Sequence, residues 1–269
     1  MIFGENVMRR FFSIICMTLM LTSLTMMVKA QSAFQSGEIL QYSLYYNWKF
    51  VWVKAGSATM SIARTNYKDT PAYRTRLLMR GSSNADNYFV LRDTLVSYTA
   101  CDNLRPLYYC KTDMEGSAYR VREVWYSYPN KKCRVKQSYT RKSGRITEKD
   151  EMLTSQVYDM LSIMLKARNY DTSKWTPGKR IHFLMTDGNG VDSQTLIYRG
   201  KQRIKMKDSH KAYRCLKLSF VETNDNGKEK EVVTFFVTDD ANHIPVRLDM
   251  YLRFGSAKAF LVGSRGLKN

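Results

Sequence analysis

Apolar and polar side chains alternate along most of this chain, which is the pattern of β-strands. Near the start, one side of the pattern holds Leu40, Tyr42, Leu44, Tyr46 and Trp48, and the other holds Gln41, Ser43, Tyr45 and Asn47. Similar runs recur at about 56–65, 72–80, 94–101, 106–113, 118–127, 132–140, 180–186, 193–199, 202–207, 213–221, 231–238, 245–252 and 258–263. Turn sequences such as Asp187-Gly188 separate them. The pattern predicts a mainly β protein with a large curved antiparallel sheet, either an open barrel or two facing sheets.

One segment has helical spacing instead. Apolar side chains recur every three or four residues between Ser155 and Arg168, which predicts a single amphipathic helix over 155–169. Thr154 or Ser155 can cap its first turn. Its methionine-rich face serves either as an adaptable binding surface or, more often, as the side that packs on a sheet.

Short matches between the two halves of the chain indicate an internal duplication. Lys68–Arg74 resembles Lys207–Arg214, and the turns that carry Pro106 and Pro245 match in the same way. All the matches are offset by 139 or 140 residues. We therefore expect a single domain over 31–269 with repeats at about 38–152 and 178–265, joined by the helix.

The first thirty residues have the features of a secretory signal peptide. Arg9 and Arg10 precede an apolar run, and Ala30 ends it in the context that signal peptidase prefers. The alternative is a retained membrane anchor. Cleavage after residue 30 predicts an exported protein, periplasmic or associated with the outer membrane, with no transmembrane span left.

The charge balance is strongly basic. The 269 residues include 43 basic and 24 acidic side chains, for a net charge of +19. Such a charge attracts anionic partners. In an exported protein these are anionic lipid, lipopolysaccharide or a lipoprotein rather than nucleic acid. The alternative is that dispersed cations only keep a strand-rich surface soluble.

No motif of a known catalytic or metal site is present, and we expect neither enzymatic activity nor a cofactor nor a bound metal. Phosphate-binding loops, nucleophile elbows and zinc helices are all missing. Four cysteines follow residue 30, of which Cys101 and Cys110 flank a turn and are the favoured disulfide pair; free buried thiols are the alternative.

Two stretches are candidate binding features. Trp48 and Trp52 lie beside lysines, and large aromatic side chains with a polar tip favour amphiphilic ligands. The second stretch contains Tyr88, Phe89, Arg92 and Asp93. Arg92 and Asp93 point to different sides, so each needs another partner. Both stretches could instead be corners of the sheet.

Three segments resemble a known family. Gly37-Glu38-Ile39-Leu40-Gln41-Tyr42, Trp52-Val53-Lys54-Ala55-Gly56 and Tyr88-Phe89-Val90-Leu91-Arg92-Asp93 together are similar to the bacterial secreted family known as domain of unknown function 3108. The resemblance implies a cell-envelope protein of a Gram-negative bacterium without a known activity. A more distant similarity is to periplasmic lipoprotein carriers, which are open barrels.

These observations favour a non-enzymatic periplasmic or cell-envelope protein that binds a hydrophobic or amphiphilic envelope component. A structural or scaffolding partner in an envelope complex is the first alternative. A hydrolase of envelope glycan is the second, because the spacing of a catalytic carboxylate pair is set in three dimensions.

Overall fold

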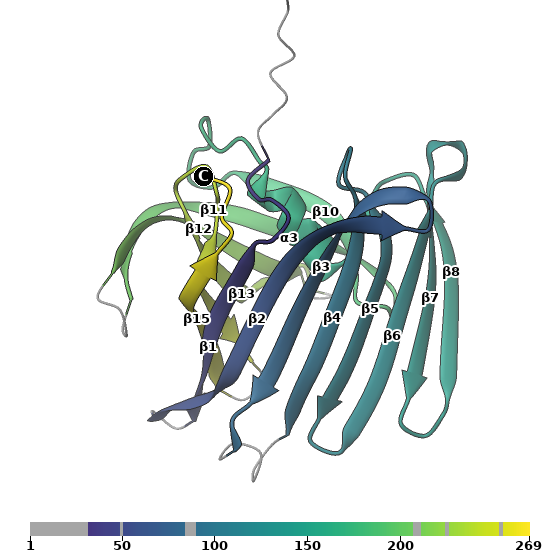
Figure 1. Cartoon of the computed structure of the whole chain (residues 1–269), viewed down its shortest axis with the longest axis horizontal. Coiled ribbons are helices and arrows are strands. Elements are labelled where there is room, and N and C mark those ends of the chain that lie inside the picture. The colour runs from purple at the N-terminus through teal and green to yellow at the C-terminus, as the bar shows by residue number, and fades with distance from the viewer. Residues whose placement is uncertain (1–31, 49–50, 84–89, 207–210, 224–225, 253–254) are drawn as a thin grey trace, which may run out of the picture. The chain divides into compact units, whose positions relative to one another are not determined.

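Fifteen strands form one hydrogen-bonded sheet in the computed structural model of the chain (Figure 1). The structure describes residues 32–48, 51–83, 90–206, 211–223, 226–252 and 255–269. The first eight strands are β1 (Ile39–Trp48), β2 (Val51–Tyr67), β3 (Thr70–Gly81), β4 (Leu91–Ala100), β5 (Pro106–Glu115), β6 (Ala118–Ser127), β7 (Cys133–Arg141) and β8 (Ile146–Leu153). The others are β9 (Val157–Tyr158), β10 (Arg180–Thr186), β11 (Val191–Lys205), β12 (Ala212–Thr223), β13 (Glu229–Thr238), β14 (Pro245–Tyr251) and β15 (Ser256–Arg265).

The strand order makes the sheet a long meander whose first and last strands meet in its middle. The order runs from β8 back to β1, continues with β15 and descends to β9. Neighbouring strands are antiparallel except β9 and β10, which are parallel. The sheet curves into a nearly closed barrel with one seam, between its edge strands β8 and β9. The prediction of a mainly β protein with a large curved sheet is therefore confirmed.

Two details of the strand prediction were wrong. β8 was not predicted, because Thr147-Glu148-Lys149-Asp150-Glu151 has no apolar alternation. As an edge strand it pairs only with β7, and charged side chains are common on such edges because they discourage pairing with other chains. The runs at 193–199 and 202–207 are one strand, β11, with an irregularity between Tyr198 and Gly200.

The predicted helix begins later than expected. The α-helix α3 spans Met160–Arg168, because residues 157–158 form β9 instead. Its N-cap is therefore Asp159, not Thr154 or Ser155. The Asp159 carboxylate accepts hydrogen bonds from the backbone N–H groups of Leu161 and Ser162, both at 2.9 Å. The Ser162 hydroxyl in turn accepts one from the Asp159 N–H, which completes a capping box.

Side chains bridge the seam where no strand ladder does. The Oε1 atom of Gln137 in β7 accepts hydrogen bonds from the Thr186 hydroxyl (2.6 Å) and the Gly190 N–H (3.0 Å), which lie at the β10–β11 turn. Lys149 of β8 donates to the Asn189 carbonyl oxygen at 2.6 Å. The sheet has two arms, one made of β1–β8 and the other of β9–β15. Helix α3 packs against β3 and β4 of the first arm and β10 of the second.

The apolar core follows from the alternation in the sequence. The larger cluster contains side chains from both arms and the helix, among them Leu40, Tyr42, Met60, Ile62, Leu165, Ile204, Phe236 and Leu261. A second cluster includes Leu95, Tyr109, Val124, Val135 and Leu161. Leu161 and Leu165 of α3 thus bury its apolar side against the sheet, which is the packing role that the sequence favoured for this helix.

A buried ion pair connects the beginning of the chain to the helix. Arg168 donates to the Glu38 carboxylate through Nη1 (2.5 Å) and Nη2 (2.9 Å), and both side chains are almost fully buried. The same guanidinium donates to the carbonyl oxygens of Asn242 and Ala33 and lies over the Phe34 ring, 5.5 Å from its centre. A buried charge is tolerated only when it is paired with an opposite charge and its hydrogen-bond donors have acceptors, as those of Arg168 do.

The internal duplication stays a prediction. Its two proline turns do share a backbone feature: Leu104 and His243, each two residues before a proline, have positive φ values of 59° and 45°. Residues 207–210 of the other match, and the expected signal peptide, lie outside the described residues. Within the described ranges, no helix is long and apolar enough to cross a membrane.

We expect Arg168→Leu to lower the free energy of unfolding by about 3–5 kcal/mol, because it leaves the Glu38 carboxylate buried and unpaired. Urea unfolding followed by circular dichroism measures this. The double variant Glu38→Leu/Arg168→Leu removes both charges and should recover part of the loss. Asp150→Asn breaks an ion pair in which both side chains are 42 % exposed and serves as the control. A loss in Arg168→Leu no larger than in this control would contradict the prediction.

A second prediction concerns Asp159. Burial raises the pKa of this carboxyl, and the hydrogen bonds from Ser162, Ser97 and Leu161 offset only part of that. The folded state therefore holds the proton more tightly than the unfolded state, so this group's contribution to stability falls as the pH rises through the range above its ordinary pKa. Asparagine also caps helices but does not ionise.

Asp159→Asn should therefore gain stability relative to the wild type as the pH rises from about 4 to 7, measured as unfolding midpoints across that range. Asp171→Asn is the control, because a hydrogen bond from the Ser173 side chain lowers the pKa of Asp171. The contribution of Asp171 therefore changes in more acidic solution, and this variant should follow the wild type over most of the range from about pH 4 to 7. A parallel pH dependence in wild type and Asp159→Asn would refute the assignment.

Candidate ligand-binding surface

The register of the central strands gathers aromatic and basic side chains on one face of the sheet. Tyr45 of β1 is opposite Lys54 of β2 on one side and Lys258 of β15 on the other. Two residues further along β1, Asn47 is opposite Trp52, so Trp52 lies on the same face as Lys54. Because alternate residues share a face, we define an aromatic–basic strip by these side chains and their neighbours on the same face. The strip consists of Tyr45, Trp52, Lys54, Arg80, Arg92, Arg247, Tyr251, Lys258 and Phe260.

Cations lie over aromatic rings within this strip. The Lys258 ammonium lies 4.4 Å from the centre of the Trp52 ring, and Trp52 is 40 % exposed. Tyr45 meets Phe260 edge to face, with ring centres 5.7 Å apart. The Arg247 guanidinium lies 5.5 Å from the Phe260 ring centre. Such contacts hold the cations beside apolar surface.

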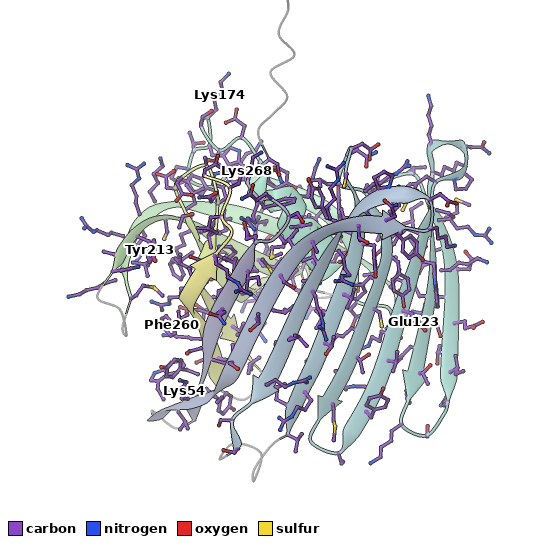
Figure 2. All side chains as sticks on the ribbon, in the orientation of Figure 1. Lys54, Glu123, Lys174, Tyr213, Phe260 and Lys268 are labelled. Carbon is purple, nitrogen blue, oxygen red and sulfur yellow. The ribbon has the colours of Figure 1, made fainter. Side chains whose placement is uncertain are left out.

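A small pocket opens in the strip. Tyr45, Trp52, Lys258 and Phe260 line a volume of about 160 Å³, so three of its four walls are aromatic. The volume is smaller than that of a typical drug-sized site, so the pocket accommodates part of a ligand, such as a segment of an acyl chain, rather than a whole ligand. Figure 2 shows Phe260 of β15 and Lys54 of β2 on the two strands that flank β1.

Positive charge dominates the strip. A single row of paired residues runs from Arg247 through Phe260, Ser43 and Ser57 to Arg80 and Arg92. The next row carries Lys258 and Lys54. The acidic side chain in these rows is Asp249, which binds Arg247 through two hydrogen bonds of 2.7 and 2.5 Å. Five cations against one carboxylate make the surface attractive to anions.

The sequence-predicted site residues have different outcomes. Trp52 and Arg92 both belong to the strip. Tyr88 and Phe89 lie outside the described residues, as does the side chain of Trp48. Asp93 lies on the opposite face from Arg92, as predicted, since Arg92 is paired with Arg80 and Asp93 with Met79.

Asp93 belongs instead to a charged cluster on the buried face. It is opposite Asp113, and the Lys111 ammonium lies 4.0 Å from Asp93 and 3.7 Å from Asp113. Asp113 also accepts hydrogen bonds from Arg120 Nε and from Arg122 Nη1, the latter at 3.1 Å. Two buried carboxylates are thus accompanied by three cations, and the shorter ion pairs all involve Asp113.

The favoured disulfide is not formed: Cys101 and Cys110 are free thiols, as are Cys133 and Cys215. Cys101 lies in the β4–β5 turn, whereas Cys110 is four residues along β5 from Pro106, at the base of that turn. At about 3.3 Å per residue this is about 13 Å, too far for a disulfide. Burial raises the pKa of all four thiols, which keeps them in the unreactive protonated form.

Sequence reasoning missed the partners of Trp52. Tyr45, Lys258, Phe260 and Arg247 come from strands at the two ends of the chain, and their proximity depends on the pairing of β1 with β15. The alternation of Ser256, Lys258 and Phe260 indicates one face of a strand, but the sequence does not indicate that this strand pairs with β1. Among the described residues, no three His, Cys, Asp or Glu side chains are close enough to hold a metal ion.

The fold defines a protein of the barrel-shaped β-sheet class, and the strip adds an aromatic and basic surface to it. The family profile described as protein of unknown function (DUF3108) matches residues 41–262, so the chain belongs to that family. Its fold is similar to the crystal structure of a β-barrel-like protein of domain of unknown function DUF1849 from Brucella abortus. That comparison has a TM-score of 0.54 and 13 % identity, and covers 86 % of this chain and 98 % of the other. The search of curated proteins found no match.

Proposed function

We propose that this protein is a non-enzymatic periplasmic or cell-envelope protein that binds an anionic lipid through the aromatic–basic strip. The observation that carries the proposal is the exposed Trp52 ring with the Lys258 ammonium above it, beside the pocket that Tyr45 and Phe260 complete. Aromatic rings accept the acyl region of an amphiphile, and the cations accept its headgroup.

The surroundings of the strip support an anionic rather than a neutral ligand. Lys54 and Arg80 are exposed on the same face as Trp52, and Asp249 neutralises only Arg247. At an anionic membrane surface each exposed Lys or Arg contributes about 1 kcal/mol of attraction. Lys54, Arg80 and Lys258 together are enough for measurable binding without any deep cavity.

The alternative of a glycan hydrolase has less support. A glycosidase needs a carboxylic acid that donates a proton and a second carboxylate across an accessible bond. Asp93 and Asp113 are a buried carboxylate pair, but Lys111, Arg120 and Arg122 are all paired with Asp113, and the Lys111 ammonium also lies 4.0 Å from Asp93. This supports a structural role for the pair. The signal peptide that the sequence predicts over residues 1–30 supports the proposed envelope location.

Vesicle co-sedimentation tests the proposal. The full chain should bind vesicles that contain phosphatidylglycerol and should not bind vesicles of phosphatidylcholine alone. Lys54→Gln/Lys258→Gln removes two cations from the strip, which at about 1 kcal/mol each predicts an approximately 30-fold weaker partition. Trp52→Ala should also weaken binding and remove the change in tryptophan fluorescence that accompanies it.

Lys174→Gln/Lys268→Gln is the matched control, because it removes the same charge from residues that Figure 2 shows far from Lys54 and Phe260. It should retain most of the wild-type binding. Equal losses in both double variants would mean that net charge alone attracts the protein to vesicles. That result, or binding to neutral vesicles as strong as to anionic ones, would overturn the proposal.

A further inference from the structure

A second pocket lies at the other end of the strands, away from the strip. Strands of a meander alternate in direction, so the β4–β5 turn is at the opposite end of the sheet from the β1–β2 turn. The pocket lies beside that turn and has a volume of about 420 Å³, within the range of small-molecule sites. It is lined by Asn103, Arg105, Tyr128, Lys131, Gln156 and Tyr158.

Arg105 is the most informative of these side chains. Its guanidinium lies over the Tyr128 ring, 4.7 Å from the ring centre, so stacking fixes its plane. Its Nε is buried, yet it has no hydrogen-bond acceptor. A buried N–H without an acceptor costs about 1–3 kcal/mol, more for a charged group. The structure therefore keeps an incompletely satisfied guanidinium in the wall of a pocket, and its positive charge favours an anionic ligand there.

The rest of the lining is cationic or neutral. Lys131 supplies a second positive charge, and the six lining residues include no carboxylate. Two acidic residues adjoin lining residues in the sequence. Asp102 is exposed and accepts hydrogen bonds from the Asn103 backbone and side chain. Asp159 is fully buried and accepts hydrogen bonds from the Ser97 hydroxyl and from the backbone N–H groups of Leu161 and Ser162. Burial raises the pKa of Tyr128, so its hydroxyl stays neutral and donates to the Pro106 carbonyl oxygen at 2.6 Å.

Hydrogen bonds connect the residues of the pocket wall, and the adjoining turns contain positive φ angles. The Gln156 side chain donates to the Tyr128 hydroxyl (3.1 Å) and to the Val157 carbonyl oxygen (2.7 Å), which ties one wall to the other. In the described residues five non-glycine residues have positive φ, and three of them lie in the two turns at the pocket: Leu104, Asn130 and Lys131. Such strain is retained where surrounding structure enforces it, and it gathers at binding sites.

We propose that this pocket binds the oxyanion group, a carboxylate or a phosphate, of a small organic anion. The Arg105 guanidinium provides a planar fork of donors, and Lys131 provides the second charge. The carbon skeleton of the ligand packs against the Tyr158 ring. The site is separate from the strip, and its ligand is a small molecule or a headgroup rather than a membrane surface.

Isothermal titration of the full chain with glycerol 3-phosphate, citrate and inorganic phosphate tests this, with glycerol as the neutral probe. At least one of the anions should bind with a stoichiometry of one, and glycerol should not. Arg105→Gln and Lys131→Gln should each weaken binding about tenfold or more. Arg105→Lys should recover little, because an ammonium has no planar fork.

Lys258→Gln, from the strip, is the control and should leave the titration unchanged, so the two proposals can fail separately. Unfolding midpoints establish that each variant is folded. Tighter binding of glycerol 3-phosphate than of phosphate supports a site that also contacts the ligand's carbon skeleton. Competition between glycerol 3-phosphate and phosphatidylglycerol vesicles that Arg105→Gln abolishes identifies the source of the oxyanion as a lipid headgroup. No binding of any of the three anions, or equal binding by Arg105→Gln, would overturn the proposal.

Discussion

The Glu38–Arg168 ion pair is the interaction on which the arrangement of the chain depends. The pair is buried, and its guanidinium also binds the carbonyl oxygens of Ala33 and Asn242, so one side chain joins the N-terminal segment, the end of α3 and the β13–β14 turn. Since β1 begins at Ile39, the pair holds the first strand at the point where it meets β15. The Gly37-Glu38 sequence is among the segments that resemble the family, and the structure gives a reason for it. The Glu38 carboxylate accepts hydrogen bonds from Arg168, the buried cation in the last turn of α3.

The middle of the sheet is held by backbone pairing, whereas its seam is held by side chains. β1 and β15 pair along nearly their full length, so the first and last strands of the chain are each held by a ladder on both sides. At β8 and β9 the ladder stops, and Gln137, Lys149 and the residues of the β10–β11 turn supply individual hydrogen bonds instead. Individual side-chain contacts are weaker than a ladder, and they open more readily. Helix α3 compensates by packing against strands of both arms.

Alternation predicted most strands correctly because a sheet with one buried face repeats every two residues. The failures have physical causes. β8 is an edge strand of charged residues. Helix α3 begins one turn later than expected because Val157 and Tyr158 pair with β10, which leaves Asp159 to form the capping box. For the site, the sequence identified Trp52 and Arg92, but not Tyr45, Lys258 or Phe260. Which strands become neighbours depends on long-range pairing, and no local pattern near residue 52 contains information about residue 258. Arg105 and Lys131 were missed for the same reason, since two turns distant in sequence form one pocket.

The distribution of charge follows from the cost of burial. The chain has 19 more basic than acidic side chains, and a buried cation must be paired. On the buried face this is what Lys111, Arg120 and Arg122 show, because Asp113 and Asp93 accompany them. The excess of cations must therefore lie where water solvates it, on exposed faces and at the ends of strands. The register then decides whether that excess is dispersed or gathered, and the central rows gather five cations beside Trp52 and Phe260. A basic composition alone predicts solubility as well as it predicts binding; aromatic rings interleaved with cations on the same rows favour binding, since solubility requires no exposed tryptophan.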